Sequence, residues 1–284
     1  MIIFKKPLAL HEFLGRKKVK HQTGFVPTMG ALHAGHVSLL NAAKKENDLA
    51  VASIFINPTQ FNDPEDFKKY PITLDKDIAM VEDAGCDVLF LPPVKDIYVT
   101  GTTNLEHYDL GFLETVLEGK YRPGHFQGVC QVVHRLLEIV LPHNLYLGQK
   151  DYQQCMVIKK LVELIGLDKK IKINICPTLR EPDGLAMSSR NTRLSPVDRA
   201  KATTISAGLR YIKENIKPGE INCYTDKMKH MLLNNGFDKI DYVEVANADT
   251  LHLVEHWNGS EKIVALAAAF LNDVRLIDNM VINP

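Results

Sequence analysis

The sequence predicts an α/β fold in which a doubly wound parallel sheet is followed by a smaller C-terminal α+β domain. Short apolar runs alternate with amphipathic stretches over residues 1–177, an order typical of parallel sheets covered by helices. Loops rich in Gly, Pro, His and Lys follow several of these runs, and beyond Pro177 helices come first and strands later. We therefore expect a catalytic domain over 1–177 and a second domain over 178–284, with ligands bound beyond the carboxyl ends of the parallel strands.

The elements of the first domain follow from their apolar patterns. Short continuous apolar runs predict buried strands, and longer stretches with one apolar face predict helices. The expected strands are 49–56, 87–91, 145–147 and 171–175, and the expected helices are 37–45, 74–84, 126–140 and 152–165.

The second domain begins after a polar connection, 177–191. Ser195 followed by Pro196 and an early Asp198 has the pattern of a helix start, with an N-cap, a proline at the first position and an acid near the positive end of the dipole. We expect this helix to reach about residue 214 and another over 223–233. Strands are expected near 240–245, 262–267 and 275–277.

Composition and charge exclude several classes of protein. The 284 residues carry 34 basic and 34 acidic side chains, and this balance argues against a dedicated nucleic-acid binder. The five cysteines form no C-x-x-C pair, so we expect neither disulfides nor a structural zinc, and a reducing cytoplasm as the setting. Buried, inert thiols are expected at Cys86, Cys130 and Cys176. No apolar stretch is long enough to cross a membrane, and the N-terminus is a poor secretory signal.

The segment 25–40, FVPTMGALHAGHVSLL, carries the strongest chemical signal. A short apolar run leads into a loop, and His33-Ala34-Gly35-His36 opens an apolar-patterned helix. A helix N-terminus suits phosphate because its first N–H groups and its dipole face the ligand. Two imidazoles placed there can donate hydrogen bonds to a phosphate whose charge grows during displacement.

Other interpretations of the two histidines stay open at this point. They would be surface or core histidines if they stood alone, although their place at a strand-to-helix turn favours phosphate. A zinc site lacks a convincing third ligand nearby. Neither a P-loop nor a G-x-G-x-x-G sequence is present.

Four further segments carry polar groups suited to ligands. Ser188-Ser189-Arg190 places two hydroxyls and a guanidinium in a loop, which suits a polyphosphate. Taken by itself, such a short sequence is more often a solvent-exposed turn without a ligand. FINPTQF at 55–61 offers two side-chain amides on a turn after an expected strand. GQKD at 148–151 places a lysine at the end of another expected strand, and YRPGHF at 121–126 is a basic loop that opens an expected helix. Asp151 would also serve as a helix cap.

The H-x-G-H sequence in this setting resembles the nucleotidyltransferase superfamily, which attacks the α-phosphate of ATP and releases pyrophosphate. The loop at 188–190 then resembles the K-M-S-K-S loop of the class I aminoacyl-tRNA synthetases. Together PTMGALHAGH, INPTQF, GQKDYQQ, DGLAMSSRN and the RLIDN at 275–279 resemble the pantothenate synthetase family over essentially the whole chain. The resemblance implies a Rossmann-like fold of the HxGH nucleotidyltransferase type.

The resemblance also implies roles for individual residues. Catalysis would involve His33, His36, Lys150 and Arg190, with His33 stabilising the transition state of adenylation. ATP would contact Met29, His33, His36, Gly148, Lys150, Asp151, Leu179, Met187, Ser188, Ser189 and Arg190. Pantoate would contact Pro27, Met29, Gln60 and Gln154.

The implied reaction is the ATP-dependent condensation of pantoate with β-alanine to pantothenate through a pantoyl-adenylate, with release of AMP and pyrophosphate. The family uses ATP with Mg²⁺ and is usually a homodimer. Asp75-Lys76-Asp77 is a candidate for a metal ligand, but Lys76 interrupts it and magnesium is commonly held by substrate phosphates, so the metal ligands stay unassigned. We expect the second domain or the 177–191 loop to act as a lid that shields the acyl-adenylate from water.

Two other functions remain as alternatives. One is an adenylyltransferase of the same superfamily that acts on a phosphorylated small molecule. The other is a nucleotide-binding or tRNA-binding module without catalysis. The zero net charge and the lack of a basic appendage argue against tRNA binding.

Overall fold

The computed structural model describes residues 1–18, 20–62, 67–103 and 105–283. The described chain divides into two compact units, Met1–Gly148 with Val157–Pro177 and Gln149–Met156 with Thr178–Pro284. None of the described helices combines the length and the apolar character needed to span a membrane.

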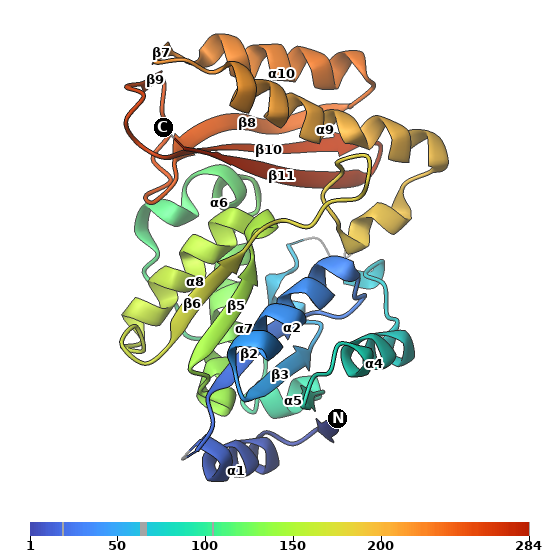
Figure 1. Ribbon diagram of the computed structural model, residues 1–284, viewed down its shortest axis with the longest axis vertical. Coiled ribbons are helices and arrows are strands. Elements are labelled where there is room, and N and C mark those ends of the chain that lie inside the picture. Colours follow the sequence, from blue (N-terminus) through green and yellow to red (C-terminus); the bar gives the residue numbers. More distant parts are fainter. Residues whose placement is uncertain (19, 63–66, 104, 284) are drawn as a thin grey trace. The chain divides into compact units, whose positions relative to one another are not determined.

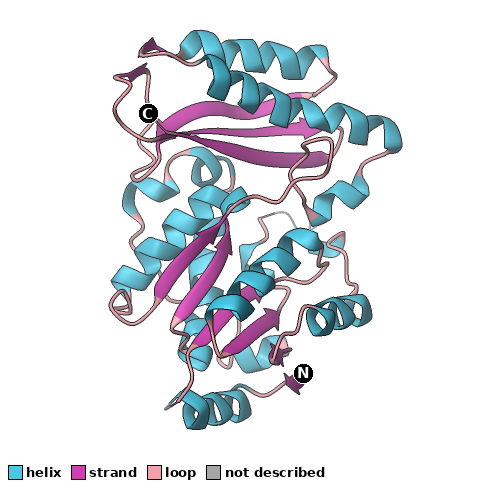
Figure 2. Cartoon of the chain, viewed as in Figure 1, coloured by secondary structure: helices cyan, strands magenta, loops and turns pink. Residues whose placement is uncertain are grey.

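The first unit is built on a parallel sheet whose described strands, six in all, run in the order β1-β4-β3-β2-β5-β6 (Figures 1 and 2). Strand numbers fall from β4 to β2 and then rise from β5 to β6, so the strand order reverses between β2 and β5, as in doubly wound sheets. The expected fold is confirmed. The strands are β1 Ile2–Phe4, β2 Thr23–Thr28, β3 Leu49–Ile54, β4 Val88–Phe90, β5 Asn144–Gly148 and β6 Lys172–Cys176.

Helices pack on both faces of this sheet. One apolar core joins strand residues such as Val26 and Ala52 to Leu40 and Val81 of two helices, α2 and α4. Alternate strand residues such as Phe25 point to the opposite face, where α7 packs against β2. The helices that begin in the first unit are α1 Pro7–Lys18, α2 Ala34–Glu46, α4 Leu74–Asp83, α5 Val94–Ile97, α6 Leu117–Tyr121 and α7 His125–Val140, while α8 Tyr152–Leu164 begins in the second unit and continues into the first.

The helix α7 approaches the segment after β3 unusually closely. A Cβ atom on Gly128 would lie 2.3 Å from the main-chain oxygen of Thr59, so only glycine allows this contact. Thr59 belongs to a 3₁₀ helix, Pro58–Gln60, and β3 ends at Ile54, two residues before the end of the expected strand 49–56. The strand ends early because Asn57 and Pro58 start this turn.

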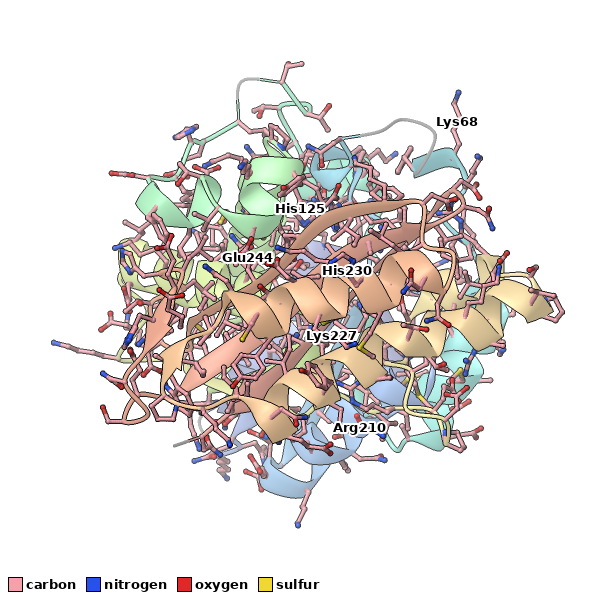
Figure 3. All side chains as sticks on the ribbon, turned by 90° about the horizontal axis from the view of Figure 1, so that it is seen from above. Lys68, His125, Arg210, Lys227, His230 and Glu244 are labelled. Atoms are coloured by element: carbon pink, nitrogen blue, oxygen red, sulfur yellow. The ribbon has the colours of Figure 1, made fainter. Side chains whose placement is uncertain are left out.

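The second unit is an antiparallel sheet in the order β11-β10-β8, with two helices packed on it. Figure 3 shows these helices, α9 and α10, running side by side, with the exposed Arg210 on α9 and the exposed Lys227 and His230 on α10. They approach closely because Gly208 lacks a side chain: a Cβ atom there would lie 2.6 Å from Cγ of Met228. The elements are α9 Pro196–Asn215, β7 Gly219–Glu220, α10 Asn222–Asn234, β8 Lys239–Asn247, β9 His256–Trp257, β10 Ile263–Leu271 and β11 Val274–Ile282.

Local sequence signals explain these elements. The Ser195 hydroxyl accepts a hydrogen bond from the Asp198 N–H at 3.1 Å, which confirms the expected cap of α9. The central strand β10 is almost entirely apolar because it is buried on both faces, and it reaches Leu271 rather than residue 267. Its alanines leave room for the helices that pack on it.

Residues Gln149–Met156 group with the second unit, although they lie within the first domain expected from the sequence. Hydrogen bonds to residues far along the chain join this segment to the second unit. The Tyr152 hydroxyl donates to the Ala248 carbonyl at 2.8 Å, and the Asn279 side chain donates to the carbonyls of Gln149 and Lys150.

The five cysteines, all of them within the described residues, form no disulfide. Burial raises the pKa of Cys86 to about 11 and that of Cys130 to about 12, so both stay protonated at neutral pH. Cys176 is only half-buried, and burial also raises its pKa.

Candidate functional site

The connection from β2 to α2 is a tight turn with an unusual backbone. Gly30 and Ala31 have φ values of 84° and 50°, so two successive residues adopt the left-handed region. A Cβ atom on residue 30 would lie 3.1 Å from Oδ2 of Asp77, which makes glycine the fitting residue there. The turn carries the chain from the carboxyl end of β2 into α2 within a few residues.

His33 and His36 form the N-terminal cap of α2. Nδ1 of His33 accepts a hydrogen bond from the Gly35 N–H at 3.2 Å, and Nδ1 of His36 accepts one from the His33 N–H at 3.3 Å. The two half-buried rings lie with their centroids 4.1 Å apart. Because both Nδ1 atoms accept, each neutral ring carries its proton on Nε2. The start of α2 therefore combines two imidazole N–H donors with the positive end of a helix dipole, an arrangement suited to an anion.

The buried carboxylate of Asp77, on α4, holds this turn in place. Its two oxygens accept hydrogen bonds from the N–H groups of Ala31 and Leu32, both at 2.8 Å, and Oδ1 also accepts one from the Thr73 hydroxyl at 2.9 Å. The side chain is fully enclosed, since Asp77 is 1% exposed. With three donors on it, this carboxylate acts as a brace for the turn.

This finding bears on the metal ligands that the sequence left unassigned. Asp77, one of the candidates, has its carboxylate occupied by the turn, and Asp75 is exposed. The described residues contain no group of three or more His, Cys, Asp or Glu side chains that could hold a metal ion. The metal ligands therefore stay unassigned.

Gln60 lies beside Met29 and has a fixed amide orientation. The Gly128 carbonyl can only accept, and it accepts from the Asn57 amide nitrogen at 3.0 Å. The same nitrogen donates to Oε1 of Gln60 at 3.1 Å, so the Gln60 amide nitrogen faces the sulfur of Met29, 2.9 Å away. Gln60 therefore presents N–H donors on its Met29 side.

Asn57 is itself held by Tyr98, whose hydroxyl donates to its Oδ1 at 2.6 Å. Burial raises the pKa of this tyrosine, which keeps the hydroxyl protonated as the donor. Tyr98 was not expected in the site from the sequence, Asp77 was considered only as a metal ligand, and Asn57 only as one of a pair of amides. Each acts through a contact between segments distant in the chain, and only the INPTQF string pointed to Asn57.

A cavity of about 290 Å³ lies beside the turn. It is lined by residues 29–31, 54–56, 71–74 and 91–94 together with Asp77. Of the residues expected in the site, Met29 belongs to this lining. Because most of the lining is apolar, the hollow suits the apolar part of a small ligand.

Two other expected residues of the first unit lie at the carboxyl edge of the sheet. Pro27 is near the end of β2, and Gly148 is the last residue of β5, which pairs with β2. The basic loop at 121–126 has internal partners: Arg122 lies 3.0 Å from Nε2 of His125, whose Nδ1 lies 2.8 Å from the Gln60 carbonyl. This places the His125 ring against the segment that carries Gln60.

In the second unit, Lys150 and Asp151 lie in a short 3₁₀ helix, Gln149–Asp151, that leads into α8. The Lys150 ammonium lies 3.7 Å from the Asp151 carboxylate, and Gln154 is half-buried in the first turn of α8. This segment thus offers a cation and an amide close together in the chain.

The loop 179–190 is folded back on itself. The Met187 N–H donates to the Leu179 carbonyl at 3.0 Å, which brings these two expected residues together. Ser188 caps a 3₁₀ helix, Ser189–Arg193, by accepting from the Arg190 N–H at 3.3 Å. The hydroxyls and the guanidinium at 188–190 therefore lie at the start of a helical turn.

The expected site residues thus fall into two sets. The first unit holds Pro27, Met29, His33, His36, Gln60 and Gly148, and the second holds Lys150, Asp151, Gln154, Leu179, Met187, Ser188, Ser189 and Arg190. Within the first set, the rings of His33 and His36 lie against each other at a tilt of 42°, and Met29 contacts Gln60.

Comparison with known proteins gives a consistent result. Residues 2–281 match the sequence family described as pantoate-beta-alanine ligase. The chain is 47% identical over 268 residues to the pantothenate synthetase of Cytophaga hutchinsonii, covering 94% of this chain and 93% of that protein. It is also 47% identical over 270 residues to the pantothenate synthetase of Acetivibrio thermocellus, covering 94% of each.

Solved structures are similar as well. A crystal structure of pantothenate synthetase from Thermus thermophilus has a TM-score of 0.90 and 37% identity, with all of both chains covered. A pantoate-beta-alanine ligase from Francisella tularensis, complexed with beta-gamma ATP and beta-alanine, has a TM-score of 0.82 and 40% identity, covering 99% of this chain and 97% of that one.

We predict that Asp77→Asn destabilises the protein. The amide keeps one acceptor but turns an N–H group toward a backbone N–H donor of the turn, so the free energy of unfolding should fall by about 2 kcal/mol. The matched control is Asp75→Asn on the exposed side of the same helix, which should change it by less than about 0.5 kcal/mol. Urea denaturation of both variants checks this, and equal stabilities would show that the turn does not depend on the carboxylate.

Proposed function

Because the chain belongs to the pantoate–β-alanine ligase family, we propose that it condenses pantoate with β-alanine by way of a pantoyl-adenylate. In the first half-reaction a pantoate carboxylate oxygen attacks the α-phosphorus of ATP and pyrophosphate leaves. In the second, the β-alanine amine attacks the carbonyl carbon of the mixed anhydride, AMP leaves, and the amine loses a proton. The Francisella tularensis relative, complexed with beta-gamma ATP and beta-alanine, supports ATP and β-alanine as ligands of the fold.

The observation that carries this proposal is the pair of imidazoles at the start of α2. Phosphoryl chemistry of this kind needs placement of the reacting groups and donors aimed at the growing charge, rather than covalent help from the protein. His33 and His36 carry Nε2 protons because both Nδ1 atoms accept backbone hydrogen bonds. We assign His33 to the transition state of adenylation and His36 to the ATP phosphates.

The remaining roles in the proposal follow the chemistry of each group. Gln60 would donate to an oxygen of pantoate, with Pro27, Met29 and Gln154 completing that subsite. Lys150 and Arg190 supply positive charge to the phosphates, and Ser188 and Ser189 hydrogen-bond the departing pyrophosphate. Gly148, Asp151, Leu179 and Met187 would contact the rest of the nucleotide.

The wider setting belongs to the same proposal. ATP would be used as its magnesium complex, in which the metal neutralises phosphate charge. We also propose a homodimer, a cytoplasmic location, and no nucleic-acid or membrane partner. The domain 1–177 would be the catalytic domain, and 178–284 its smaller companion.

The products of the reaction test the proposal as a whole. We expect AMP and pantothenate to form in equal amounts when ATP, pantoate and β-alanine are all present, and no AMP when either acid is left out. Chromatographic analysis of the nucleotides checks this. Formation of ADP instead of AMP, or nucleotidyl transfer to a phosphorylated acceptor, would contradict it.

His33→Asn separates catalysis from helix capping. Asparagine is a good N-cap, so α2 should stay intact, but its short side chain does not reproduce the Nε2 donor. We expect the single-turnover rate of adenylation to fall roughly 10²-fold or more, the usual scale for one preorganised donor.

The control for this experiment is His230→Asn, which changes an exposed histidine of α10 and should leave the rate unchanged. Thermal unfolding shows whether His33→Asn is folded. A folded His33→Asn protein that adenylates pantoate at the wild-type rate would refute the role assigned to His33.

A further inference from the structure

Three residues of the second unit form a connected polar network: Arg180, Asp278 and Asn279. The two terminal nitrogens of Arg180 donate to the two carboxylate oxygens of Asp278 at 2.6 and 3.0 Å. The Asp278 side chain is completely buried, with 0% exposure, and its Oδ1 also accepts from the Asn279 N–H at 2.7 Å. A buried carboxylate paired in this two-pronged way is costly to disturb, because removing one partner leaves an uncompensated charge.

At one end, the network holds the loop 179–187. Nη1 of Arg180 donates to the Gly184 carbonyl at 3.0 Å, and Arg180 pairs with Ala186 through the backbone. Gly184, at the tip of this loop, has a φ of 93°, a conformation suited to glycine. The guanidinium therefore ties the tip of the loop to its base, just before Ser188.

At the other end, the network holds the segment that carries Lys150. The amide nitrogen of Asn279 donates to the carbonyls of Gln149 and Lys150 at 2.9 and 2.8 Å. Carbonyl oxygens only accept, so the orientation of this amide is fixed. Its Oδ1 accepts in turn from the Gln149 amide at 3.2 Å, which closes a ring of hydrogen bonds around the segment.

Arg180 connects the two ends directly, because its Nη2 also donates to the Asn279 carbonyl at 3.2 Å. The segment at Lys150 and the loop at 188–190 are distant in the chain, and both are rich in groups that suit phosphate. We propose that Arg180, Asp278 and Asn279 are positioning residues that fix the Lys150 segment and the 188–190 loop relative to each other for the use of ATP. This inference rests on the proposed function, in which those two segments contact ATP.

The network would act by preorganising groups that bind ATP. Groups that bind a charged transition state act best when they are held in place before the ligand arrives, and small misplacements are costly. Lysine cannot replace Arg180, because a single ammonium does not reproduce the planar fork that engages Asp278, Gly184 and Asn279 together. Disturbing the network should therefore lower kcat/KM for ATP more than it changes KM for pantoate or for β-alanine.

The test compares Arg180→Lys and Asn279→Ala with a matched control, Arg275→Lys. Arg275 is on the same strand as Asn279 and pairs with the buried Asp241 at 2.7 Å, a contact between β11 and β8. We expect kcat/KM for ATP to fall about tenfold or more in the first two variants, while KM for pantoate and for β-alanine changes less than about twofold. Arg275→Lys should lose comparable thermal stability but keep wild-type kinetics.

The double variant Arg180→Lys/Asn279→Ala gives a second prediction of the same inference. Since both residues act through one network, their effects on kcat/KM for ATP should combine to much less than the product of the single effects. Fully multiplicative effects would overturn the idea of one connected device. If Arg180→Lys does not fold, Asn279→Ala carries the test, because it leaves the ion pair in place.

Lys150→Ala and Ser189→Ala distinguish failure of this inference from failure of the proposed function. If both impair ATP kinetics while Arg180→Lys and Asn279→Ala behave like Arg275→Lys, the positioning role is overturned. If Lys150→Ala and Ser189→Ala leave ATP kinetics unchanged, the assignment of these segments to ATP fails, and the positioning role falls with it.

Discussion

The hydrogen bonds from Ala31 and Leu32 to the buried carboxylate of Asp77 are the contact on which the rest of the first unit's chemistry depends. They hold the turn in which two successive residues, Gly30 and Ala31, adopt the left-handed region, a conformation that the backbone would otherwise leave. Because the turn is fixed, α2 begins at Ala34, with His33 as its N-cap, a few residues after β2 ends at Thr28. The same turn sets where the two imidazoles lie, and their caps set which ring nitrogen carries the proton.

In both units, hydrogen bonds to main-chain carbonyls orient side-chain amides. Carbonyl oxygens that can only accept fix the orientation of a side-chain amide, and the amide then presents a defined donor or acceptor. Gly128 does this for Asn57, and through it for Gln60. The carbonyls of Gln149 and Lys150 do the same for Asn279. In each case main-chain carbonyls decide which way a side-chain amide points its oxygen and its nitrogen. Substituting a neighbouring side chain leaves these carbonyls in place.

Much of this architecture could be predicted from the sequence. The alternation of apolar runs located β3 to β6 and the major helices, and Ser195 located the start of α9. The N-terminal elements were missed: α1, Pro7–Lys18, is a helix because Leu10 and Leu14 lie one turn apart and are buried, although His11 and Glu12 interrupt the apolar run. Local periodicity is weak there, and packing in the folded unit decides the outcome.

The site shows the same division between local and tertiary information. The H-x-G-H turn was evident because its glycine, its histidines and the following helix are contiguous. Asp77 gave no such signal as a brace, since one acid in a helix looks solvated until the fold brings the turn against it. The RLIDN string likewise resembled a family motif, but its tie to Arg180 and to the Lys150 segment comes only from the strand β11 and its long-range contacts.

In the proposed reaction, an acyl-adenylate forms before the amine is needed. The most direct measurement is exchange of labelled pyrophosphate into ATP by the wild-type protein, with pantoate present and β-alanine left out. We expect exchange that requires pantoate, because the proposed first half-reaction would be reversible on its own. Absence of exchange from folded protein that binds ATP and pantoate would contradict it.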